Sequence, residues 1–363
     1  MQGVALNGAR VFLTGHTGFK GGWLALMLAE FGAEVHGYAL QAPTSPSFYE
    51  VAGVAGRLSS EALADVRDFN RLKAAMSHVR PSVVMHLAAQ PLVRRSYREP
   101  LETVATNVLG TANVLQAASE VPGVRAVVNV TSDKCYENRE RPGPYREDEA
   151  MGGFDPYSAS KGCAELLTAA WRRSFLAGQG ISVASARAGN VIGGGDWAED
   201  RLVPDFLRAI DAGQELVLRS PASTRPWQHV LEPLTGYLML AERLLADQGE
   251  QFAEGWNFGP DSADMRSVRW MTEQLCAGVP GSRWRVDSAV QLHEAVLLSL
   301  NSAKAMAKLG WRPRWDAAEA ISRTLDWHRA WRAGSDMRAF SIGQIREHGG
   351  GFSNRSSSVG TAR

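Results

Sequence analysis

A phenol and an ammonium group lie four residues apart in "DPYSASKGCAELL", at Tyr157 and Lys161. Residues at this spacing share one face of a helix, so the two side chains would be neighbours. A positive charge beside a phenol favours the phenolate and lowers its pKa. The phenolate could take a proton from a hydroxyl group while a hydride leaves the same carbon for an oxidised nicotinamide. Isolated pairs at this spacing are mostly turns of a surface helix. The catalytic interpretation of Tyr157 and Lys161 therefore depends on which other residues accompany Tyr157.

A strand end supplies the first of these companions. The predicted strand in "VVNVTSDKCYE" ends at Thr131, Ser132, Asp133 and Lys134. Open α/β sheets build their sites at the carboxyl ends of their strands. We therefore expect this strand end to lie beside Tyr157, with Thr131 holding the hydroxyl group that loses its proton.

A strand-to-helix turn with three spaced glycines supplies the second companion, in "VFLTGHTGFKGG". The first glycine permits a tight turn, the second lets the backbone approach a pyrophosphate, and the third lets the helix pack against the strand. The helix N-terminus then offers N–H groups to the phosphates. The turn by itself could also be a ligand-free connection, and Lys20 could be a phosphate contact or an exposed charge. We expect dinucleotide binding through Gly15, His16, Thr17, Gly18, Phe19, Lys20 and Gly21.

The acid that usually follows the second strand of a dinucleotide-binding fold is missing. It is expected about 20 residues after the glycine turn, where it binds the ribose hydroxyls, but "EVHGYAL" is followed by "QAPTSPS". No arginine for a 2′-phosphate stands there either, so we expect NAD while NADP stays open. Asp65, in "LADVRD", could face the adenine or be a solvated loop carboxylate.

Short apolar segments alternate with helical patterns through the first half of the chain. The segments are "ARVFLTG", "EVHGYAL", "PSVVMHLAA", "VRAVVNVTS" and "ISVASARAGNVIG", and their continuous apolar character is typical of strands buried on both faces. This alternation predicts an α/β fold, a Rossmann-type doubly wound parallel sheet with a smaller, mostly helical C-terminal substrate lobe. We assign residues 1–190 and about 225–262 to the dinucleotide-binding domain, 191–224 and 263–335 to the lobe, and 336–363 to a flexible tail.

Composition excludes several classes of protein. The 363 residues carry a formal net charge of +1, which favours neither a nucleic-acid nor a membrane partner. The three cysteines have no paired spacing, which argues against a disulfide framework or a metal site and suits a reducing cytoplasm. We also expect neither a signal peptide nor a membrane span, since no basic region precedes a long apolar run.

Together the motifs resemble the extended short-chain dehydrogenase/reductase family of NAD-dependent epimerases and dehydratases. The resemblance rests on "TGHTGFKG", "HLAAQPLVRRSY", "TSDKCYEN", "DPYSASKGCAE" and "RAGNVIGGGDWAEDRLVPDFLRA", and covers the chain from about Gly8 to Arg332. Asp133–Lys134 is similar to the pair in the branch that acts on CDP-sugars, whereas dTDP-sugar dehydratases have Asp–Glu and simple epimerases have neither pair. The resemblance therefore implies a lyase with CDP-glucose as substrate, serving deoxysugar synthesis.

The resemblance also implies a cycle of three steps. Tyr157, helped by Lys161, deprotonates the C4 hydroxyl while hydride passes to NAD; water then leaves across C5 and C6; the hydride finally returns to C6. Water loss needs an acid for the leaving hydroxyl and a base for the C5 proton. Asp133, kept protonated, would be the acid. Lys134 would be the base if it is neutral, or else only a charge that stabilises the enolate.

Ligand contacts and assembly follow from the resemblance as well. It places Leu87, Ala88 and Ala89 at the cofactor, and Ser96, Asn190, Arg201, Leu202 and Arg225 at the substrate, with Arg225 facing the diphosphate. It implies a homodimer, or a dimer of dimers, paired through the helix that holds Lys161 and the helix in "PLETVATNVLGTANVLQAASE". The rival functions are another nucleotide-sugar dehydratase, an epimerase, or a non-catalytic dinucleotide sensor. Intact Thr131, Tyr157 and Lys161 argue against the sensor.

Overall fold

Seven parallel strands form the central sheet of the computed structural model, which describes residues 5–141, 143–287 and 297–349. Their order is β11-β6-β5-β4-β1-β2-β3, and every neighbouring pair is parallel. The strands are β1 (Arg10–Thr14), β2 (Glu34–Ala39), β3 (Ser60–Leu63), β4 (Val83–His86), β5 (Ala126–Val130), β6 (Ser182–Ala188) and β11 (Gly255–Phe258). The predicted Rossmann-type doubly wound sheet is confirmed.

Side chains of the central strands alternate between two apolar cores, one on each face of the sheet. On β1, Val11 and Leu13 belong to one core and Phe12 to the other, because successive side chains of a strand point to opposite faces. The first core is covered by α1 (Phe19–Glu30) and α9 (Leu231–Leu245), and the second by α3 (Phe69–Val79) and α6 (Gly110–Glu120). This burial on both faces explains the continuous apolar segments in the sequence.

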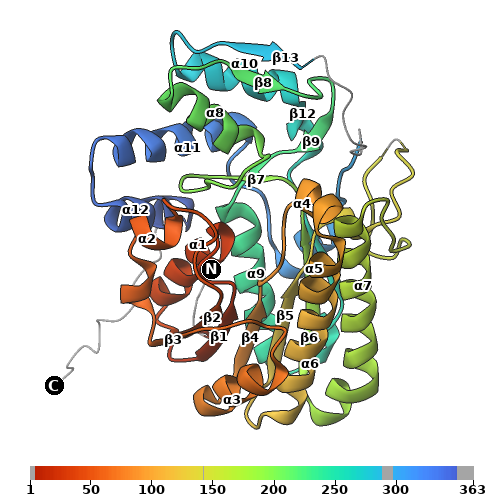
Figure 1. Ribbon diagram of the computed structural model, residues 1–363. Helices are drawn as coiled ribbons and strands as arrows, with labels where there is room; N and C mark the ends of the chain where they lie inside the picture. Colours follow the sequence, from red (N-terminus) through yellow and green to blue (C-terminus); the bar gives the residue numbers. More distant parts are fainter. Residues whose placement is uncertain (1–4, 142, 288–296, 350–363) are drawn as a thin grey trace, which may run out of the picture.

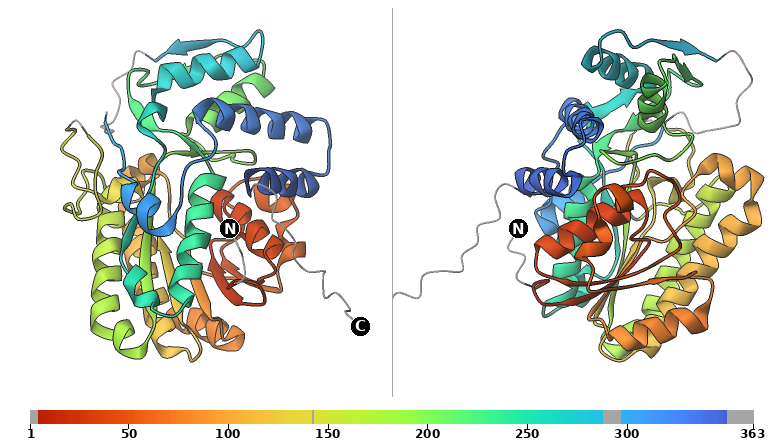
Figure 2. Two further views of the ribbon diagram at one scale, coloured as in Figure 1. Left: turned by 180° about the vertical axis from the view of Figure 1, so that it is seen from behind. Right: turned by 60° about the vertical axis from the view of Figure 1, so that its left-hand side comes forward.

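Helix α7 (Pro156–Trp171) packs outside α6 and α5 (Pro100–Val104), as Figures 1 and 2 show. It starts at Asp155, whose carboxylate accepts the N–H of Ser158 at 3.0 Å, and Pro156 occupies its first position. Both features favour a helix start. Tyr157 and Lys161 therefore lie in the first two turns of α7 and at the carboxyl edge of the sheet.

A smaller lobe lies over the carboxyl ends of the strands (Figure 1). The hydrophobic core of the lobe includes Phe206, Met271, Leu275 and Ile321. Its elements are α8 (Leu202–Asp211), β8 (Leu216–Leu218), β9 (Thr224–Pro226), β12 (Met265–Ser267), α10 (Val268–Gly278), β13 (Trp284–Val286) and α11 (Ala317–Arg332). A short ladder of β7 (Val191–Ile192) with β10 (Gln228–His229) connects it to the sheet domain. The remaining short helices include α2 (Phe48–Val51) and α4 (Val93–Arg98).

The predicted flexible tail is wrong for residues 337–349, which form helix α12 (Met337–Gly349). Met337 and Ile345 are buried in the same core as α1, and Arg346 pairs with Glu30 of α1 at 3.0 Å. The Gly- and Ser-rich composition that indicated disorder begins only at Gly349, and the rest of that tail, 350–363, lies outside the described residues. The lobe boundary also differs, because Leu309 and Trp311 pack in the sheet-domain core.

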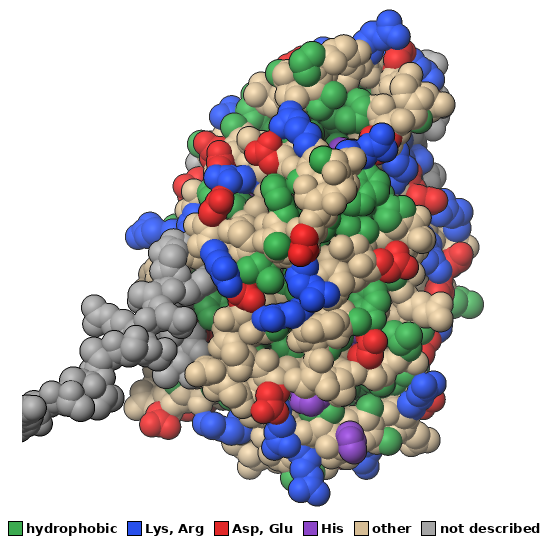
Figure 3. All heavy atoms as spheres, turned by 90° about the vertical axis from the view of Figure 1, so that its left-hand side faces the viewer, with side chains coloured by type: hydrophobic (Ala, Val, Ile, Leu, Met, Phe, Trp, Pro, Cys, Tyr) green, Lys and Arg blue, Asp and Glu red, His purple; other side chains and the backbone are tan. Residues whose placement is uncertain are grey.

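Charge on the surface is mixed. Figure 3 shows Lys and Arg side chains dispersed among Asp and Glu over one face of the molecule, without a field of one sign. Such a face has no particular attraction for a polyanion. None of the helices in the described parts of the chain has both the length and the apolar character needed to cross a bilayer.

Candidate active site

The glycine turn is built so tightly that two of its glycines cannot carry a side chain. Gly15 has a φ of +79°, and a Cβ on it would lie 2.7 Å from the amide nitrogen of Ala88. A Cβ on Gly21 would lie 2.0 Å from the carbonyl oxygen of Gly15. On Gly18, by contrast, a Cβ would meet only that oxygen, at 3.4 Å. Because no other atom of the described residues, the two chain neighbours aside, lies within 4 Å of that Cβ position, the turn fits a dinucleotide whose pyrophosphate approaches the backbone there.

Two alanine variants separate packing from binding at this turn. We expect Gly21→Ala to lower the free energy of unfolding by about 1–3 kcal/mol, since the new methyl group displaces the backbone of Gly15. Gly18→Ala should leave stability within about 0.5 kcal/mol but weaken NAD binding. Urea unfolding and calorimetric titration with NAD measure the two effects. Equal stability of both variants would contradict the packing role of Gly21.

Leu87 and Ala88 are held beside the turn by β1. The Thr14 hydroxyl oxygen accepts the N–H groups of both residues at 3.1 Å. Ala89 follows in the same segment, and all three residues are partly exposed at the carboxyl edge of the sheet. The structure therefore brings these three predicted cofactor contacts to the glycine turn.

His16 and Thr17 face the protein. The His16 imidazole lies against Gly37, and its Nε2 is 3.0 Å from Glu61 Oε2, which also accepts the Tyr49 hydroxyl at 2.8 Å. Burial lowers the pKa of His16 even though Glu61 opposes this. Thr17 donates its hydroxyl to the Leu40 carbonyl at 2.8 Å. Sequence reasoning missed Glu61, because its pairing with His16 depends on the register of β2 and β3.

The side chains of Asp65 and Lys20 lie in different places relative to the catalytic residues. Asp65 follows β3 at the carboxyl edge, but its carboxylate binds the Arg67 guanidinium at 2.6 and 2.9 Å. Lys20 Nζ lies 3.5 Å from the Tyr237 hydroxyl. Burial, with Arg201 and Lys161 nearby, lowers the pKa of Lys20 to about 7. Lys20 therefore points toward the catalytic residues, and the exposed-charge alternative is wrong.

Tyr157 and Lys161 are both buried, with 8 % and 6 % of their surface exposed. Burial raises the pKa of Tyr157 to about 12, against the effect of a hydrogen bond with Ser132. Burial lowers the pKa of Lys161 to about 8. Without ligands the pair is therefore a neutral phenol beside an ammonium group that loses its proton more easily than a solvated lysine. A further positive charge in the site would favour the phenolate.

Thr131 is not placed where the sequence suggested. Its hydroxyl donates to the buried Glu165 carboxylate, whereas the hydroxyl of the next residue, Ser132, donates to Asp133 Oδ1 at 2.9 Å and opposes the rise that burial causes in the pKa of Tyr157. The reason is the strand geometry, because successive side chains point to opposite sides. Sequence reasoning could not show that the Thr131 hydroxyl is bound to Glu165, because this contact depends on how α7 packs beside the end of β5.

Asp133 is a buried carboxyl group with 3 % of its surface exposed. Its Oδ1 accepts the Ser132 hydroxyl at 2.9 Å, and its Oδ2 has no hydrogen-bond partner among the described residues. Burial raises the pKa of Asp133, although Lys134 opposes this. A carboxyl group in such a position favours its protonated form and can act as an acid.

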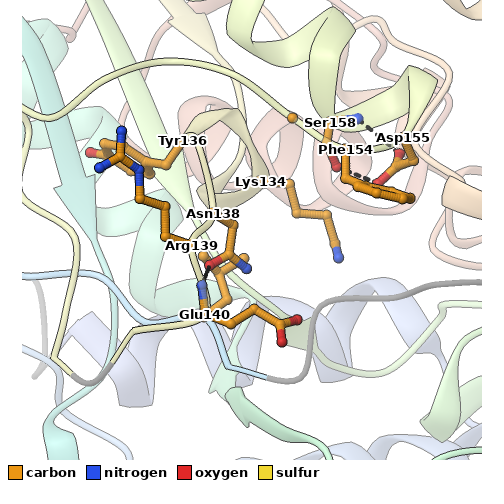
Figure 4. Close-up of a pocket in the computed structure, with 10 residues that line it drawn as sticks. Lys134, Tyr136, Asn138, Arg139, Glu140, Phe154, Asp155 and Ser158 are labelled. Carbon is orange, nitrogen blue, oxygen red and sulfur yellow. Dashed lines mark hydrogen bonds between the residues drawn. The ribbon is translucent and has the colours of Figure 1, made fainter.

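Lys134 extends into a pocket of about 330 Å³ beside these residues (Figure 4). The segment Asn138–Glu140 forms one side of the pocket, and Phe154, Asp155 and Ser158 form the other. The full lining is Lys134, Tyr136, Asn138, Arg139, Glu140, Gly153, Phe154, Asp155, Ser158 and Leu298. The choice between the base and the charge role of Lys134 stays a prediction.

The predicted substrate residues divide into two groups. Arg201, directly before Leu202 at the start of α8, is close enough to Tyr157 to act on it electrostatically, and the buried Arg225 on β9 does the same at Asp133. Asn190 joins β6 to β7 and is partly exposed. Ser96, however, is fully buried and donates to the Val93 carbonyl at 2.6 Å, which commits its hydroxyl to α4.

A buried ion pair between Glu165 and Arg187 contacts Thr131 at the end of β5. Glu165 accepts from Arg187 at 2.7 Å, from Ser185 at 2.6 Å and from Thr131, and Arg187 also donates to the Tyr136 hydroxyl at 2.6 Å. Burial pushes the pKa of Glu165 up, but Arg187 and the hydroxyl donors outweigh burial and hold it below its usual value. Sequence reasoning missed both charges.

Replacing Glu165 with Gln should leave Arg187 buried without a counter-charge and lower the free energy of unfolding by about 3–5 kcal/mol. The wild-type contribution is present at neutral pH and is lost as pH falls through the lowered pKa of Glu165, so the difference between the two proteins should shrink on acidification. Urea unfolding at several pH values measures this. Asp326→Asn, which breaks the exposed pair with Arg329, is the matched control and should cost about 0–1 kcal/mol.

The comparison with known families decides the assignment of this site. The family model for GDP-mannose 4,6 dehydratase matches residues 12–324, which include every residue of the site. The chain belongs to the GDP-mannose 4,6 dehydratase family. The predicted membership of the epimerase and dehydratase group is thereby confirmed.

This chain is similar to individual proteins of known sequence and known structure. It is 50 % identical over 349 residues to the CDP-glucose 4,6-dehydratase of Salmonella typhimurium, covering 94 % of this chain and 96 % of the relative. It is 33 % identical over 254 residues to a dTDP-glucose 4,6-dehydratase of Streptomyces antibioticus, covering 69 % and 71 %. The solved dTDP-glucose 4,6-dehydratase DesIV of Streptomyces venezuelae, with NAD and TYD bound, has a TM-score of 0.76 and 26 % identity over 90 % of this chain and 99 % of its own.

Proposed function

We propose that this protein is an NAD-dependent lyase that converts CDP-glucose to CDP-4-dehydro-6-deoxy-glucose and water. The observation that carries the proposal is Asp133, a buried carboxyl group whose pKa is raised and whose Oδ2 has no hydrogen-bond partner among the described residues. An epimerase needs no such acid, whereas loss of a hydroxyl group does. The 50 % identity to the Salmonella CDP-glucose 4,6-dehydratase supports the substrate.

The residues of this chain supply the acid–base chemistry of the proposed reaction. Tyr157 takes the proton of the C4 hydroxyl, and Lys161 stabilises the phenolate by its charge. Asp133 gives its proton to the C6 hydroxyl, which leaves as water, and Lys134 takes and returns the C5 proton. The glycine turn would hold NAD, which would supply the hydride chemistry that the changes at C4 and C6 require. NAD is bound in the solved structures of the dTDP-glucose 4,6-dehydratase DesIV and of MoeE5, which supports NAD over NADP as the cofactor.

The charged groups of the lobe fit a nucleoside diphosphate. Arg201 and Arg225 are guanidinium groups close to Tyr157 and Asp133, and guanidinium groups suit phosphate oxygens. Arg201 is also held by Asp196 at 2.9 Å, which fixes its position. We propose that these arginines bind the diphosphate of the substrate, with Asn190 and Leu202 nearby. Ser96 is not included among these contacts, since it is fully buried and its hydroxyl donates to the Val93 carbonyl.

The decisive experiment is incubation with NAD and CDP-glucose deuterated at C4. Loss of water with deuterium moved to C6, seen by mass spectrometry and NMR, is the expected result. Unchanged sugar or an epimer would contradict the proposed reaction. Parallel incubations with UDP-, dTDP- and GDP-glucose test the nucleotide, and turnover of one of them in place of CDP-glucose would assign the enzyme to another nucleotide-sugar dehydratase.

We also propose a homodimer, paired through α5, α6 and α7. Several large apolar side chains are exposed on these helices and their extensions, with 83 % of Leu101 and 60 % of Leu166 accessible, together with Val104, Leu109 and Phe175. Exposed apolar groups gathered on neighbouring helices favour an interface. Sedimentation velocity tests this, because a monomer at micromolar concentration would contradict it.

We also propose that the protein is located in the cytoplasm. All three cysteines, Cys135, Cys163 and Cys276, are free thiols in the structure, which suits a reducing compartment. Cell fractionation with an antibody against the protein tests this location, and recovery in a secreted fraction would contradict it.

A further inference from the structure

The proposed reaction leaves two hydroxyl groups of the hexose without an assigned partner. It assigns the C4 hydroxyl to Tyr157, C5 to Lys134 and the C6 hydroxyl to Asp133, while the diphosphate at C1 is assigned to the arginines of the lobe. The hydroxyls at C2 and C3 remain, and the reaction does not change them. Polar groups that leave water need hydrogen-bond partners in the site. A carboxylate suits two neighbouring hydroxyls, because it has two acceptor oxygens.

The pocket that Lys134 enters is the place where such a carboxylate would act. Lys134 works at C5 in the proposed reaction, so the hexose has to reach its ammonium group inside this pocket. The volume of about 330 Å³ is within the range of small-molecule sites. Phe154, with 78 % of its surface exposed, forms one wall. An aromatic wall beside polar groups suits a sugar, whose ring carries C–H bonds as well as hydroxyls.

Several polar side chains of the pocket are bound within the protein. The Asp155 carboxylate accepts the N–H of Ser158 at 3.0 Å and its hydroxyl at 2.6 Å. The Tyr136 hydroxyl accepts from Arg187 at 2.6 Å. Arg139 extends away from the ammonium group that enters the pocket (Figure 4). These side chains therefore build the wall of the pocket and are committed to it.

The turn at Asn138 directs Glu140 into the pocket. Asn138 Oδ1 accepts the Glu140 N–H at 2.9 Å and the Tyr145 hydroxyl at 3.0 Å, and its Nδ2 donates to the Leu297 carbonyl at 3.0 Å. Within this turn Glu140 has a φ of +48°, in the left-handed region that glutamate rarely adopts. Its carboxylate extends into the same space as the Lys134 ammonium group (Figure 4). Strain of this kind is concentrated at ligand sites.

We propose that Glu140 binds the C2 and C3 hydroxyls of the hexose and thereby selects sugars that carry both. The inference rests on the proposed function, which brings the hexose to Lys134. Hydrogen bonds to a charged group are stronger than those between neutral groups. Because neither hydroxyl reacts, the contact is the same in the bound substrate and in the transition state, so it acts on binding and not on the chemical steps.

Steady-state kinetics with CDP-glucose and its 2-deoxy and 3-deoxy analogues test this contact in Glu140→Gly. Glycine adopts a left-handed backbone freely, so the variant keeps the turn and loses the carboxylate. We expect KM for CDP-glucose to rise at least about tenfold, with kcat changed less than about threefold. The wild type should use each deoxy analogue about 10–100-fold less well than CDP-glucose. In Glu140→Gly the three substrates should differ less than about threefold.

Glu137→Ala is the matched control. It removes an exposed carboxylate of the same segment that does not line the pocket, so it should keep the wild-type KM and the discrimination against the analogues. If Glu140→Gly does not fold, as judged by thermal unfolding, Glu140→Asn gives the same test, because asparagine tolerates the left-handed region.

Three results would overturn the contact. One is a wild type that uses the deoxy analogues as well as CDP-glucose. Another is a Glu140→Gly enzyme that discriminates against them as strongly as the wild type does. The third is a lowered kcat with unchanged KM, which would mean that Glu140 acts on the chemistry through Lys134. If the wild type does not dehydrate CDP-glucose, the proposed function fails instead.

Discussion

Tyr157→Phe should lower the rate of CDP-glucose turnover by about 10²–10⁴-fold, the usual contribution of one acid–base group. The phenyl ring fills the same buried space beside Lys161 but cannot take the C4 proton, so no reduced nicotinamide should form when substrate is added. Absorbance of NADH in a stopped-flow spectrometer, together with product NMR, measures this effect.

The position of Tyr157 makes this variant informative, because the residue lies in the first turn of a capped helix and its replacement leaves the cap at Asp155 intact. NAD affinity, measured by calorimetric titration, should change less than about threefold and is the internal control. Undiminished NADH formation on addition of CDP-glucose would exclude Tyr157 as the base.

Asp133→Asn should stop the reaction one step later than Tyr157→Phe. The amide cannot donate the proton that the C6 hydroxyl needs, so dehydration should fall by about 10²–10⁴-fold while oxidation at C4 continues. NADH and a 4-keto sugar that still carries its 6-hydroxyl should therefore accumulate. Stopped-flow absorbance and mass spectrometry of quenched samples detect the two species.

The pH dependence of the wild type provides a second view of Asp133. Burial raises the pKa of this group, so its acid form persists to higher pH than for a solvated carboxyl, and dehydration should weaken as pH rises through that raised pKa. Asp326→Asn, an exposed change on α11, should leave turnover and its pH profile unchanged. An Asp133→Asn enzyme that forms the 6-deoxy product at the wild-type rate would rule out the acid role.

The sheet could be predicted from sequence because its strands are buried on both faces. Residues such as Val11, Phe12 and Leu13 are all apolar since one core or the other receives each of them. Tyr157, Lys161, Asp133 and the glycine turn were also predictable, because local spacing defines their geometry. These features are each encoded within a few consecutive residues.

The rest of the site depends on contacts between distant segments. Thr131 and Ser132 are equivalent in sequence, and only the packing of α7 beside the end of β5 directs the Thr131 hydroxyl to Glu165 while the Ser132 hydroxyl binds Asp133. Glu165 and Arg187 are 22 positions apart and meet only because α7 crosses β6. Helix α12 was missed because its apolar residues gain a partner only when the chain returns to α1.

Helix α12 also has a mechanical consequence. It packs on the cofactor-side helix α1 and on α11 of the lobe (Figure 2), and its His348 binds Glu232 of α9 at 2.8 Å. Glu232 in turn accepts the N–H groups of Arg314 and Trp315, in the segment that leads to α11. Helix α12 is thus a brace that contacts both halves of the molecule. A rigid swing of the lobe would have to break this brace, so the spacing between the two ligand-binding halves is set by residues far from either ligand.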